Sequence, residues 1–420
     1  MKITLTQFRP NTAEAVWTDC FAQAIAELHK AGGGVLTVPT GEYSTGPIEL
    51  CSNMELHLEP GAVIRFLNDP AAFPLQECQY EGRISHRPKP CLSAFNAENV
   101  ALTGSGVRDG CGAPWWAAPR ARPLANGRPY LLHFENVTHL RVCGVQLRNS
   151  PAWTVHPLNC VDVLIEDVSI CNPYNSPNTD GINPESCRDV RILNCRVDVG
   201  DDCITLKSGT EETPSPVPCE NIVIANCLLV HGHGGIVIGS EMSGGVRNVT
   251  VTNCVFTGTD RGLRVKTRRR RGGCVENLRL SNLVMERVFC PFVFNMYYSC
   301  GTAEKDRWVW EKTPYPVDGG TPAFRNIRIN GVTVVGATAS AGFFYGLAES
   351  PIDGLSLTDC HIEMARGAAP EKPAMMGNLE PMSARGFFLR NAKNVEFHNV
   401  TLKNADGEAY DTDESVDGEF

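Results

Sequence analysis

Four consecutive segments of this chain carry ionisable side chains at matching positions. The segments are 180–185, 201–207, 233–239 and 261–266. They align when four apolar residues are taken as anchors, namely Ile182, Ile204, Ile236 and Leu263. The anchor and the residue two positions on are apolar in every segment, except that Pro184 takes one of these places. This alternation is typical of a β-strand with one face turned inward and the other outward.

The ionisable residues of these segments fall into columns around the anchors. Asp180 and Asp202 lie two residues before their anchors, whereas Asp201 and His233 lie three before theirs. The last segment adds two cations, Arg264 and Lys266. If the strands stack in parallel, the carboxylates, the imidazole and the cations converge on one patch. Crowded carboxylates resist joint ionisation, so such a patch is suited to acid–base chemistry on an acidic substrate.

The elements that must position these residues are predicted by an internal repeat. A short pattern of alternating polar and aliphatic residues with a turn Asn, Asp or Gly recurs along the chain. Its short intervals, mostly in the twenties, set the length of one coil, and the long intervals carry insertions. The pattern begins at Asn99, His139, Asp162, Asp189, Asn221, Asn248, Asn277, Asn326, Gly354 and Asn394. Such a period predicts an all-β solenoid, a single-stranded parallel β-helix of about ten coils.

The ends of the predicted solenoid have their own signals. Thr18 and Asp19 begin an amphipathic helix that the glycines at 32–34 end, so residues 12–34 are predicted to cap the N-terminal end. Residues 406–420 contain acids but no Lys or Arg and are predicted to be a frayed, disordered tail. We expect long loops at 67–130 and 299–323, and a single β-helix domain over residues 1–420.

Bulk composition limits the classes of partner. The chain has 420 residues and a net charge of −9, which argues against nucleic acid and an anionic membrane surface as partners. Neither a signal peptide nor a membrane span is visible, so we expect a cytoplasmic protein, unless a leading segment has been removed. Many of the 18 cysteines stand at equivalent places of the repeat, which favours reduced thiols in a core over disulfides or zinc ligands.

Read in order, the four segments contain a set of short motifs. These are Asn178-Thr179-Asp180, Gly200-Asp201-Asp202, Gly232-His233-Gly234 and Arg264-Val265-Lys266. The ordered set resembles glycoside hydrolase family 28, the polygalacturonases and related pectin hydrolases. The resemblance extends to the Asp-Gly-Cys-Gly sequence at 109–112, the tryptophans at 115–116 and the N-terminal helix. It implies a right-handed parallel β-helix and hydrolysis of an α-linked galacturonide with inversion at the anomeric carbon.

The resemblance also implies catalytic roles for single residues. Asp201 matches the general acid, which must protonate the glycosidic oxygen before it can leave. Asp180 and Asp202 match the pair that holds and activates water, and His233 matches the histidine that tunes the acid. No metal and no cofactor are implied. The pair His231 and His233 could suggest a metal site, but the sequence offers no third ligand in phase with them.

Substrate contacts are implied at four further positions. Arg264 and Lys266 match cations that grip a galacturonate carboxylate, for which a guanidinium and an ammonium group are suited. Asn178 belongs to the first motif and is expected to bind substrate. Tyr298 matches a sugar-contacting tyrosine, with its neighbour Tyr297 as the rival. The expected partner is a pectin-derived acidic oligosaccharide, and the oligomeric state stays open.

The most specific function that the sequence favours is an exo-acting galacturonidase that releases galacturonic acid from oligogalacturonides. The exo part rests on the missing secretion signal and on the two long loops, which would close one end of a groove. One rival is a family member acting on rhamnogalacturonan or a substituted galacturonan. Another is a pectate lyase, which shares the fold but needs calcium carboxylates and an arginine base. A third is a non-catalytic carbohydrate-binding β-helix, which requires no convergence of ionisable residues.

Two other polar features have simpler interpretations. His156 is predicted to be a packing histidine with satisfied hydrogen bonds, although it could also line the cleft. The four consecutive arginines at 268–271 are interpreted as a solvated loop, with a positive rim that attracts a polyanionic sugar as the alternative.

Overall fold

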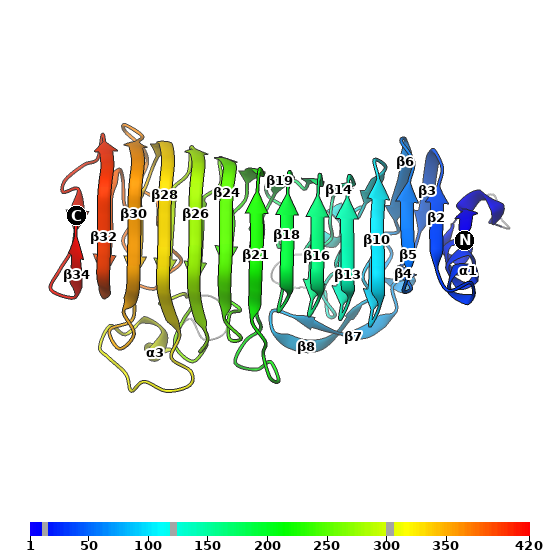
Figure 1. Cartoon of the computed structure of the whole chain (residues 1–420), viewed down its shortest axis with the longest axis horizontal. Helices are drawn as coiled ribbons and strands as arrows, with labels where there is room; N and C mark the ends of the chain where they lie inside the picture. Colours follow the sequence, from blue (N-terminus) through cyan, green and yellow to red (C-terminus); the bar gives the residue numbers. More distant parts are fainter. Residues whose placement is uncertain (11–15, 118–123, 300–305) are drawn as a thin grey trace. The chain divides into compact units, whose positions relative to one another are not determined.

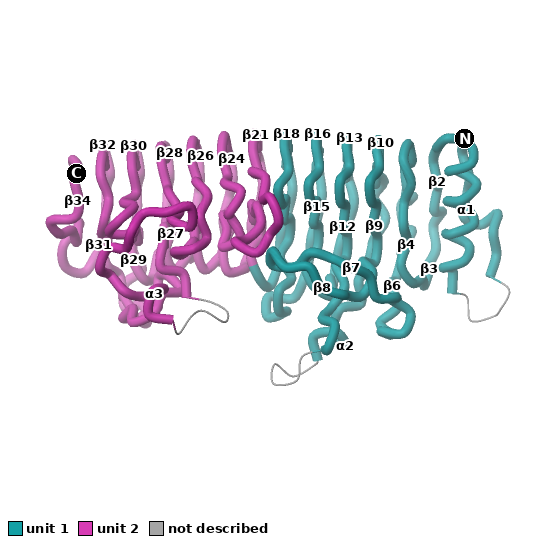
Figure 2. The backbone as a smooth tube through the Cα atoms, turned by 90° about the horizontal axis from the view of Figure 1, so that it is seen from below, with its two compact units in different colours: residues 1–201 teal, residues 202–420 magenta. Residues whose placement is uncertain are grey.

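The protein comprises two units, each of which is built from short parallel strands. The computed structural model describes residues 1–10, 16–117, 124–299 and 306–420. The units comprise residues 1–201 and 202–420 (Figure 2). Among the described residues, no helix is long and apolar enough to cross a lipid bilayer. The prediction of one domain over the whole chain stays a prediction.

Unit 1 contains three ladders of parallel strands, so that successive coils lie on one another (Figure 1). The first ladder runs through β1 (Lys2–Thr4), β2 (Gly34–Val38), β5 (Met54–Leu58), β10 (Glu98–Gly104), β13 (Thr138–Cys143), β16 (Val161–Glu166) and β18 (Arg188–Leu193). The second runs through β3 (Gly41–Thr45), β6 (Ala62–Phe66), β11 (Val107–Asp109), β14 (Gln146–Arg148), β17 (Ser169–Cys171) and β19 (Arg196–Val199). The third contains β4 (Ile48–Leu50), β9 (Leu92–Phe95), β12 (Leu132–Glu135) and β15 (Val155–Leu158).

Unit 2 repeats this arrangement with longer strands. One ladder pairs both β21 (Cys219–Ala225) and β22 (Leu228–His231) with β24 (Val246–Thr257) and continues through β26 (Cys274–Glu286), β28 (Ala323–Ala337), β30 (Ile352–Met364), β32 (Ala392–Lys403) and β34 (Val416–Glu419). The other runs through β20 (Ile204–Leu206), β23 (Ile236–Ile238), β25 (Arg261–Lys266), β27 (Cys290–Asn295), β29 (Ser340–Tyr345), β31 (Arg385–Arg390) and β33 (Tyr410–Asp411).

The register of the motif segments is the one that the sequence predicts within unit 2. Ile204 pairs with Ile236, and Ile236 pairs with Leu263, so three anchors form one column. In unit 1 the fourth anchor, Ile182, forms a bridge with Val155. All four anchors are buried, because each strand turns this face into the interior of its coil.

An asparagine ladder accounts for the recurring polar residue of the repeat. In unit 2 the amide of Asn248 donates to Asn221 over 3.1 Å, Asn277 donates to Asn248 over 3.1 Å, and Asn326 donates to Asn277 over 2.7 Å. Each has a left-handed backbone, with φ between 52° and 60°. Asparagine tolerates this conformation better than most residues, and its amide can both donate and accept along the stack.

The N-terminal cap forms as predicted but is shorter. Helix α1 spans Thr18–Lys30 and buries Phe21, Ala24 and Leu28 on one face. It contacts the first strands of unit 1, namely β1, β2 and β4. Of the predicted range, residues 12–15 lie outside the described residues, and Gly34 already begins β2.

Two regions differ from the predicted irregular structure. Residues 67–130 contain the coil strands β9, β10 and β11, the short helix α2 (Ala113–Trp116), and an antiparallel hairpin of β7 (Leu75–Tyr80) and β8 (Arg83–Pro88). Sequence reasoning missed this hairpin because a proline usually argues against a strand. Pro88 is the last residue of β8, which is an edge strand, and edge strands tolerate proline. In the excursion at 299–323, the described residues before β28 begins at Ala323 contain one element, the short helix α3 (Arg307–Trp310).

The acidic segment 406–420 was predicted to be disordered, but it forms two short strands. β33 pairs with β31, and β34 pairs with β32. Arg390 supplies the missing positive charge, since it forms ion pairs with Asp411 and Asp413 at 2.7 and 3.1 Å. The composition of the segment could not show that Arg390, which is distant in sequence, and the edges of β31 and β32 stabilise it.

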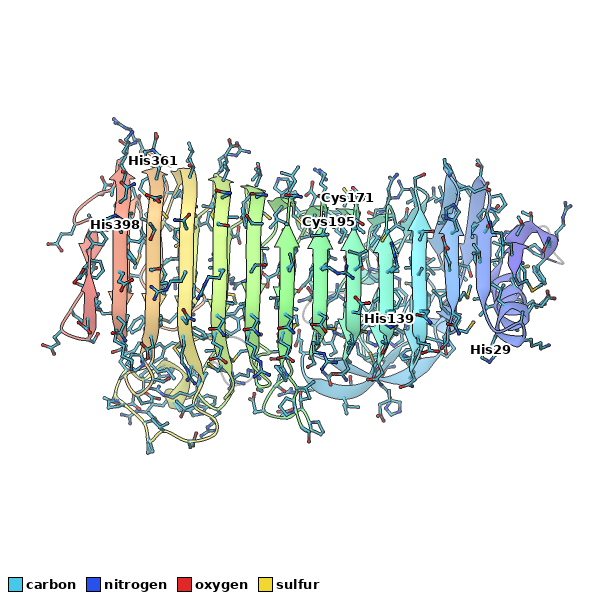
Figure 3. The ribbon with its side chains drawn as sticks, viewed as in Figure 1. His29, His139, Cys171, Cys195, His361 and His398 are labelled. Atoms are coloured by element: carbon cyan, nitrogen blue, oxygen red, sulfur yellow. The ribbon has the colours of Figure 1, made fainter. Side chains whose placement is uncertain are left out.

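The cysteines fill the interior in the way that the repeat indicates. All those in the described part of the chain are free thiols, and most are buried. Cys171 is exposed, whereas Cys195 is buried, and both are labelled in Figure 3. Burial raises the pKa of the Cys78 thiol to about 12, so this group stays protonated as a small apolar side chain.

Candidate active site

The first motif forms a tight turn after β17 in unit 1. Asn178 has a left-handed backbone with φ of 52°, and the Thr179 hydroxyl lies 2.5 Å from the hydroxyl of Ser176. Beyond the turn, Glu185 bridges to Leu158 of β15, which fixes the segment on the third ladder. Asp180 is 4% exposed, and its carboxylate accepts a hydrogen bond of 3.0 Å from the side-chain amide of Asn183.

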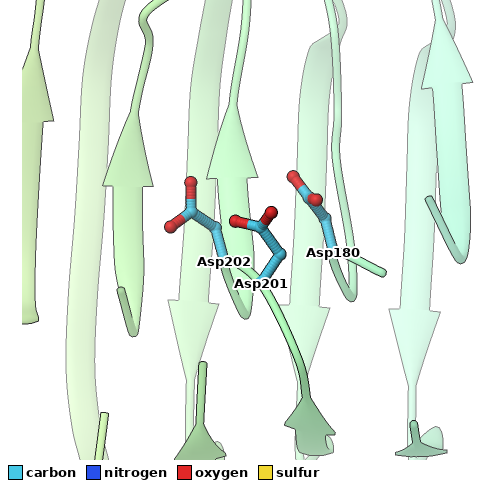
Figure 4. Close-up of side chains that lie close together, drawn as sticks. All are labelled: Asp180, Asp201 and Asp202. Atoms are coloured by element: carbon cyan, nitrogen blue, oxygen red, sulfur yellow. The ribbon is translucent and has the colours of Figure 1, made fainter. Parts of the chain in front are cut away.

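Asp201 follows β19 and lies close to Asp180 in unit 1. One carboxylate oxygen of each lies within 4.8 Å of the other, and Asp201 is half-buried (Figure 4). Gly200 makes this approach possible, because a Cβ at this position would lie 2.3 Å from the carbonyl oxygen of Ser176. The structure therefore brings together two of the predicted catalytic carboxylates, and their roles stay predictions.

Asp202, the next residue, begins unit 2 and accepts hydrogen bonds from two cations. Arg264 donates to one carboxylate oxygen over 3.0 Å, and Lys266 donates to the other over 2.8 Å. Burial alone would raise the pKa of Asp202, but Lys266 and Arg264 outweigh it and hold the pKa well below its ordinary value. Asp202 therefore stays ionised to lower pH than an ordinary aspartate, which suits a base and not an acid.

Strand β25 presents both cations on the same face. Arg264 pairs with Val237 of β23 on one side and with Val293 of β27 on the other, so it lies on an inner strand of the parallel ladder. Arg264 and Lys266 are two residues apart, and alternation along the strand turns both toward Asp202. Their side chains are 4% and 8% exposed.

The third motif reaches the same part of unit 2 through its glycines. The amide of Cys203 donates to the carbonyl of Gly234 over 2.8 Å, which ties this segment to the residue after Asp202. A Cβ on Gly234 would lie 3.2 Å from a carboxylate oxygen of Asp202. His233 itself is exposed, and its role in tuning the acid stays a prediction.

Two neighbouring tyrosines lie in different surroundings. The ring centre of Tyr298 is 5.4 Å from the Lys266 ammonium and 5.9 Å from the Arg264 guanidinium. Tyr297 is fully buried, and the ammonium of Lys312 lies 3.3 Å from its ring centre. Of the pair, Tyr298 lies beside the predicted substrate-binding cations.

Sequence reasoning missed a segment that covers β25. The carbonyls of Lys372 and Pro373 accept hydrogen bonds of 2.8 and 3.0 Å from Arg261, at the start of the strand. Met375 places its sulfur 3.1 Å from Arg264, and its carbonyl accepts from Asn295 over 3.0 Å. These partners lie about a hundred residues apart in the chain, and no local pattern relates them.

A buried ion pair follows the second motif. Lys207 donates to Glu241 over 2.8 Å, and both side chains are largely buried. Burial would raise the pKa of Glu241, but Lys207 and Arg271 lower it to about 2. Glu241 thus stays ionised, and the pair forms a charged neighbour of β20 that the sequence did not indicate.

His156 has the packing role that the sequence favoured. It is fully buried, and its ring nitrogens lie 3.0 Å from Glu185 and 3.0 Å from the ring of His133. The arginine run, in contrast, is solvated only in part, since Arg270 is exposed and Arg268 is half-buried. Arg269 and Arg271 are buried and paired with Glu349 and Glu211, respectively.

The donor set does not favour a metal ion at Asp202. Asp180, Asp201 and Asp202 are all carboxylates, which divalent cations accept as ligands. However, both oxygens of Asp202 already accept hydrogen bonds from cationic groups. A metal ion at this carboxylate would have to displace Arg264 or Lys266 or bear their repulsion.

Comparison with known proteins decides the family. The model of glycosyl hydrolases family 28 matches residues 36–367. The chain belongs to this family. A probable polygalacturonase of Vitis vinifera is 30% identical over 363 residues, which are 84% of this chain and 72% of the relative. An endo-polygalacturonase of Pectobacterium carotovorum subsp. carotovorum is 30% identical over 272 residues, 61% of this chain and 65% of the relative.

Solved structures give the same family and fold. A hyperthermoactive exopolygalacturonase from Thermotoga maritima is 30% identical with a TM-score of 0.76, covering 96% of this chain and 92% of that one. A family 28 exopolygalacturonase of Yersinia enterocolitica has a TM-score of 0.78 at 20% identity, covering 100% and 78%, which shows the fold alone. The predicted right-handed parallel β-helix is confirmed, and this family 28 protein is a glycosidase.

Proposed function

We propose that this family 28 enzyme hydrolyses α-1,4-galacturonide linkages in pectin-derived acidic oligosaccharides. One observation carries the proposal: Arg264 and Lys266 of strand β25 both donate hydrogen bonds to the carboxylate of Asp202. Asp202 directly follows Asp201, the predicted general acid. Cations at this place suit a substrate that bears a carboxylate on each sugar. A neutral glycan would offer these cations no carboxylate besides that of Asp202.

The three carboxylates then divide the work. Asp201 donates its proton to the glycosidic oxygen, and the bond from this oxygen to the anomeric carbon breaks. Asp202 and Asp180 hold a water molecule and accept its proton as the water oxygen attacks the anomeric carbon. The low pKa of Asp202, set by Lys266 and Arg264 against the effect of burial, keeps this base ionised. His233 tunes the acid.

Attack of water opposite the leaving group inverts the anomeric carbon. Proton NMR of the first product formed tests this step, because the two anomers give separate signals before mutarotation mixes them. An initial β-anomer from the α-linked substrate supports inversion. An initial α-anomer contradicts it.

We further propose exo action that releases single galacturonic acid residues. Support comes from the Thermotoga maritima exopolygalacturonase, whose chain this protein covers at 30% identity. Product analysis on a trimeric and a longer oligogalacturonide distinguishes the alternatives. Monomer from the first minutes supports exo action, whereas early intermediate lengths support endo action. An unsaturated product supports a lyase, and cleavage of a rhamnogalacturonide alone replaces the substrate but keeps the family.

The decisive variant is Asp201→Asn. Removal of a general acid costs about 10²–10⁴-fold in rate. We expect a loss of turnover in this range, with the melting temperature unchanged, because the amide keeps the shape of the carboxylate. Near wild-type turnover in the folded variant would sink the assignment of Asp201.

The location in the cell is a separate proposal. We propose a cytoplasmic enzyme that acts on imported oligosaccharides, and the free core thiols are consistent with a reducing compartment. Fractionation of the source cells with an antibody against the protein tests the location. Recovery in the medium or envelope fraction contradicts it.

A further inference from the structure

Arg128 forms a bridge between two coils of unit 1 at the first motif. One terminal nitrogen donates to the carbonyl of Pro151 over 2.9 Å and to the carbonyl of Pro177 over 2.5 Å. The other donates to the side-chain oxygen of Asn178 over 2.7 Å. The guanidinium thus holds the entrance of the turn whose next residues are Thr179 and Asp180.

The bridge is itself held by the β7–β8 hairpin. Arg87 of β8 donates to the main-chain carbonyl of Arg128 over 3.0 Å and lies 3.8 Å above the ring of Tyr80. Gly127, the residue before Arg128, has a left-handed backbone with φ of 70°, which glycine adopts without strain. Arg128 therefore has little freedom, which a positioning group requires.

Arg128 also brings a positive charge to the carboxylates. Burial lowers the pKa of its guanidinium, and the charges of Asp180 and Asp201 oppose this effect. The other groups that face it come from the hairpin, namely the hydroxyl of Tyr80 and the cation of Arg87. An arginine stays protonated under these conditions, so the two carboxylates face a permanent positive charge.

We propose that Arg128 is a positioning residue for the hydrolysis: it fixes the turn that carries Asp180 and supplies a positive charge to Asp180 and Asp201. The inference rests on the proposed function, because these carboxylates are assigned there as base and acid. It also explains why the hairpin, which contains no motif residue, packs against this coil.

Two consequences separate positioning from a merely structural role. Displacement of a catalytic group by 1 Å can cost about 10²-fold in rate. Loss of the positive charge favours the protonated form of both neighbouring carboxyls. An acid that must be protonated and a base that must be ionised then both titrate at higher pH. The whole bell-shaped profile of kcat against pH is therefore expected to move to higher pH.

The test compares Arg128→Met and Arg128→Lys with Arg191→Met. Arg191 is a matched control, since it pairs with Asp162 at 2.8 Å on the exposed face of the same unit. We expect Arg128→Met to lose about 10²-fold in kcat and its profile to move to higher pH. Arg128→Lys keeps the charge, so its profile stays in place while kcat falls. Arg191→Met leaves both unchanged.

An unshifted profile with wild-type kcat in folded Arg128→Met overturns the inference. If this variant does not fold, Arg128→Lys decides: unchanged kcat would then contradict positioning. A second readout does not depend on the substrate. With ¹³C-labelled aspartate, carboxyl titration by NMR in Arg128→Met must show two carboxyls that protonate at higher pH than in the wild type. A wild type that cleaves no galacturonide contradicts the proposed function, whereas unshifted titrations contradict the role of Arg128.

Discussion

Two pairs of cationic residues lie three positions apart in the chain and differ in their hydrogen-bond partners. Arg264 and Lys266 lie on strand β25, and Arg269 and Arg271 lie just after it. Burial does not distinguish them, since the side chains of all four are 8% exposed or less. Ion pairing does not distinguish them either, because each contacts a carboxylate.

The partners make the difference. Arg264 and Lys266 both donate to one carboxylate, that of Asp202. Arg269 gives its five donors to Glu349 and to the main-chain carbonyls of Trp308, Glu311 and Thr313. A guanidinium whose donors all meet acceptors of the chain ties a loop in place. Buried basic residues therefore need their partners identified before a function is assigned to them.

The largest effect is expected from Arg269→Met. Removing one partner of a buried pair leaves Glu349 uncompensated, which costs about 3–5 kcal/mol of stability. We expect a lower midpoint of urea unfolding, while turnover per folded molecule at low temperature stays close to that of the wild type. The matched control is Arg269→Met/Glu349→Leu. Both charges are absent from this double variant, so we expect it to recover part of the lost stability. Loss of turnover in a stable Arg269→Met protein would place this arginine in the site.

Lys266→Met is expected to affect function more than stability, because Arg264 still pairs with Asp202. Loss of a charge-assisted contact costs about 1.5–3 kcal/mol, here in binding and turnover on galacturonides. Methyl esterification removes the charge that Lys266 recognises, so the same variant should lose less on an esterified substrate. Equal losses on both substrates would mean that Lys266 only supports Asp202. The melting temperature serves as the check that the fold is intact.

The smallest effect concerns Lys312, a cation with no hydrogen-bond partner among the described residues. Burial and then Arg269 lower the pKa of Lys312 from 10.5 to about 7. The unfolded chain therefore binds more protons between these values, and stability increases with pH across this window. Lys312→Met should remove that increase and raise the free energy of unfolding by about 1 kcal/mol at pH 7. The gain is small because cation–π contacts with Tyr297 and Tyr345 already offset part of the cost of burying the ammonium group.

Thermal unfolding of Lys312→Met and the wild type at pH 7 and pH 10 measures this prediction. A gain at pH 7 that disappears at pH 10 agrees with it. Destabilisation at both values would show that the cation–π contacts outweigh the desolvation of the ammonium group.

Local periodicity predicted most of the fold and the strand register. Ile204, Ile236 and Leu263 pair as aligned, because one side of each strand must be apolar at every second residue. The order of the motifs likewise predicted which carboxylates lie near each other in unit 1. Both inferences need only neighbouring residues or neighbouring coils.

Contacts between distant segments could not be predicted in this way. Arg128 bonds to Asn178, fifty positions away, and Arg261 bonds to Pro373, more than a hundred positions away. The run at 268–271 looked solvated because its carboxylate partners, Glu211 and Glu349, lie far from it in the chain. A charge pattern shows that a partner is needed, but not whether solvent or the fold provides it.

The way in which the ladders end has a consequence for solubility. A stack of parallel strands presents unpaired main-chain groups at each end, and these recruit other chains into aggregates. In unit 1 the strand at the end of the first ladder, β1, is only three residues long and is covered by α1. In unit 2 the edge strand β34 carries Asp417 and Glu419. These short, covered or charged edges oppose pairing with other chains, so we expect a protein that lacks them to be more prone to aggregate.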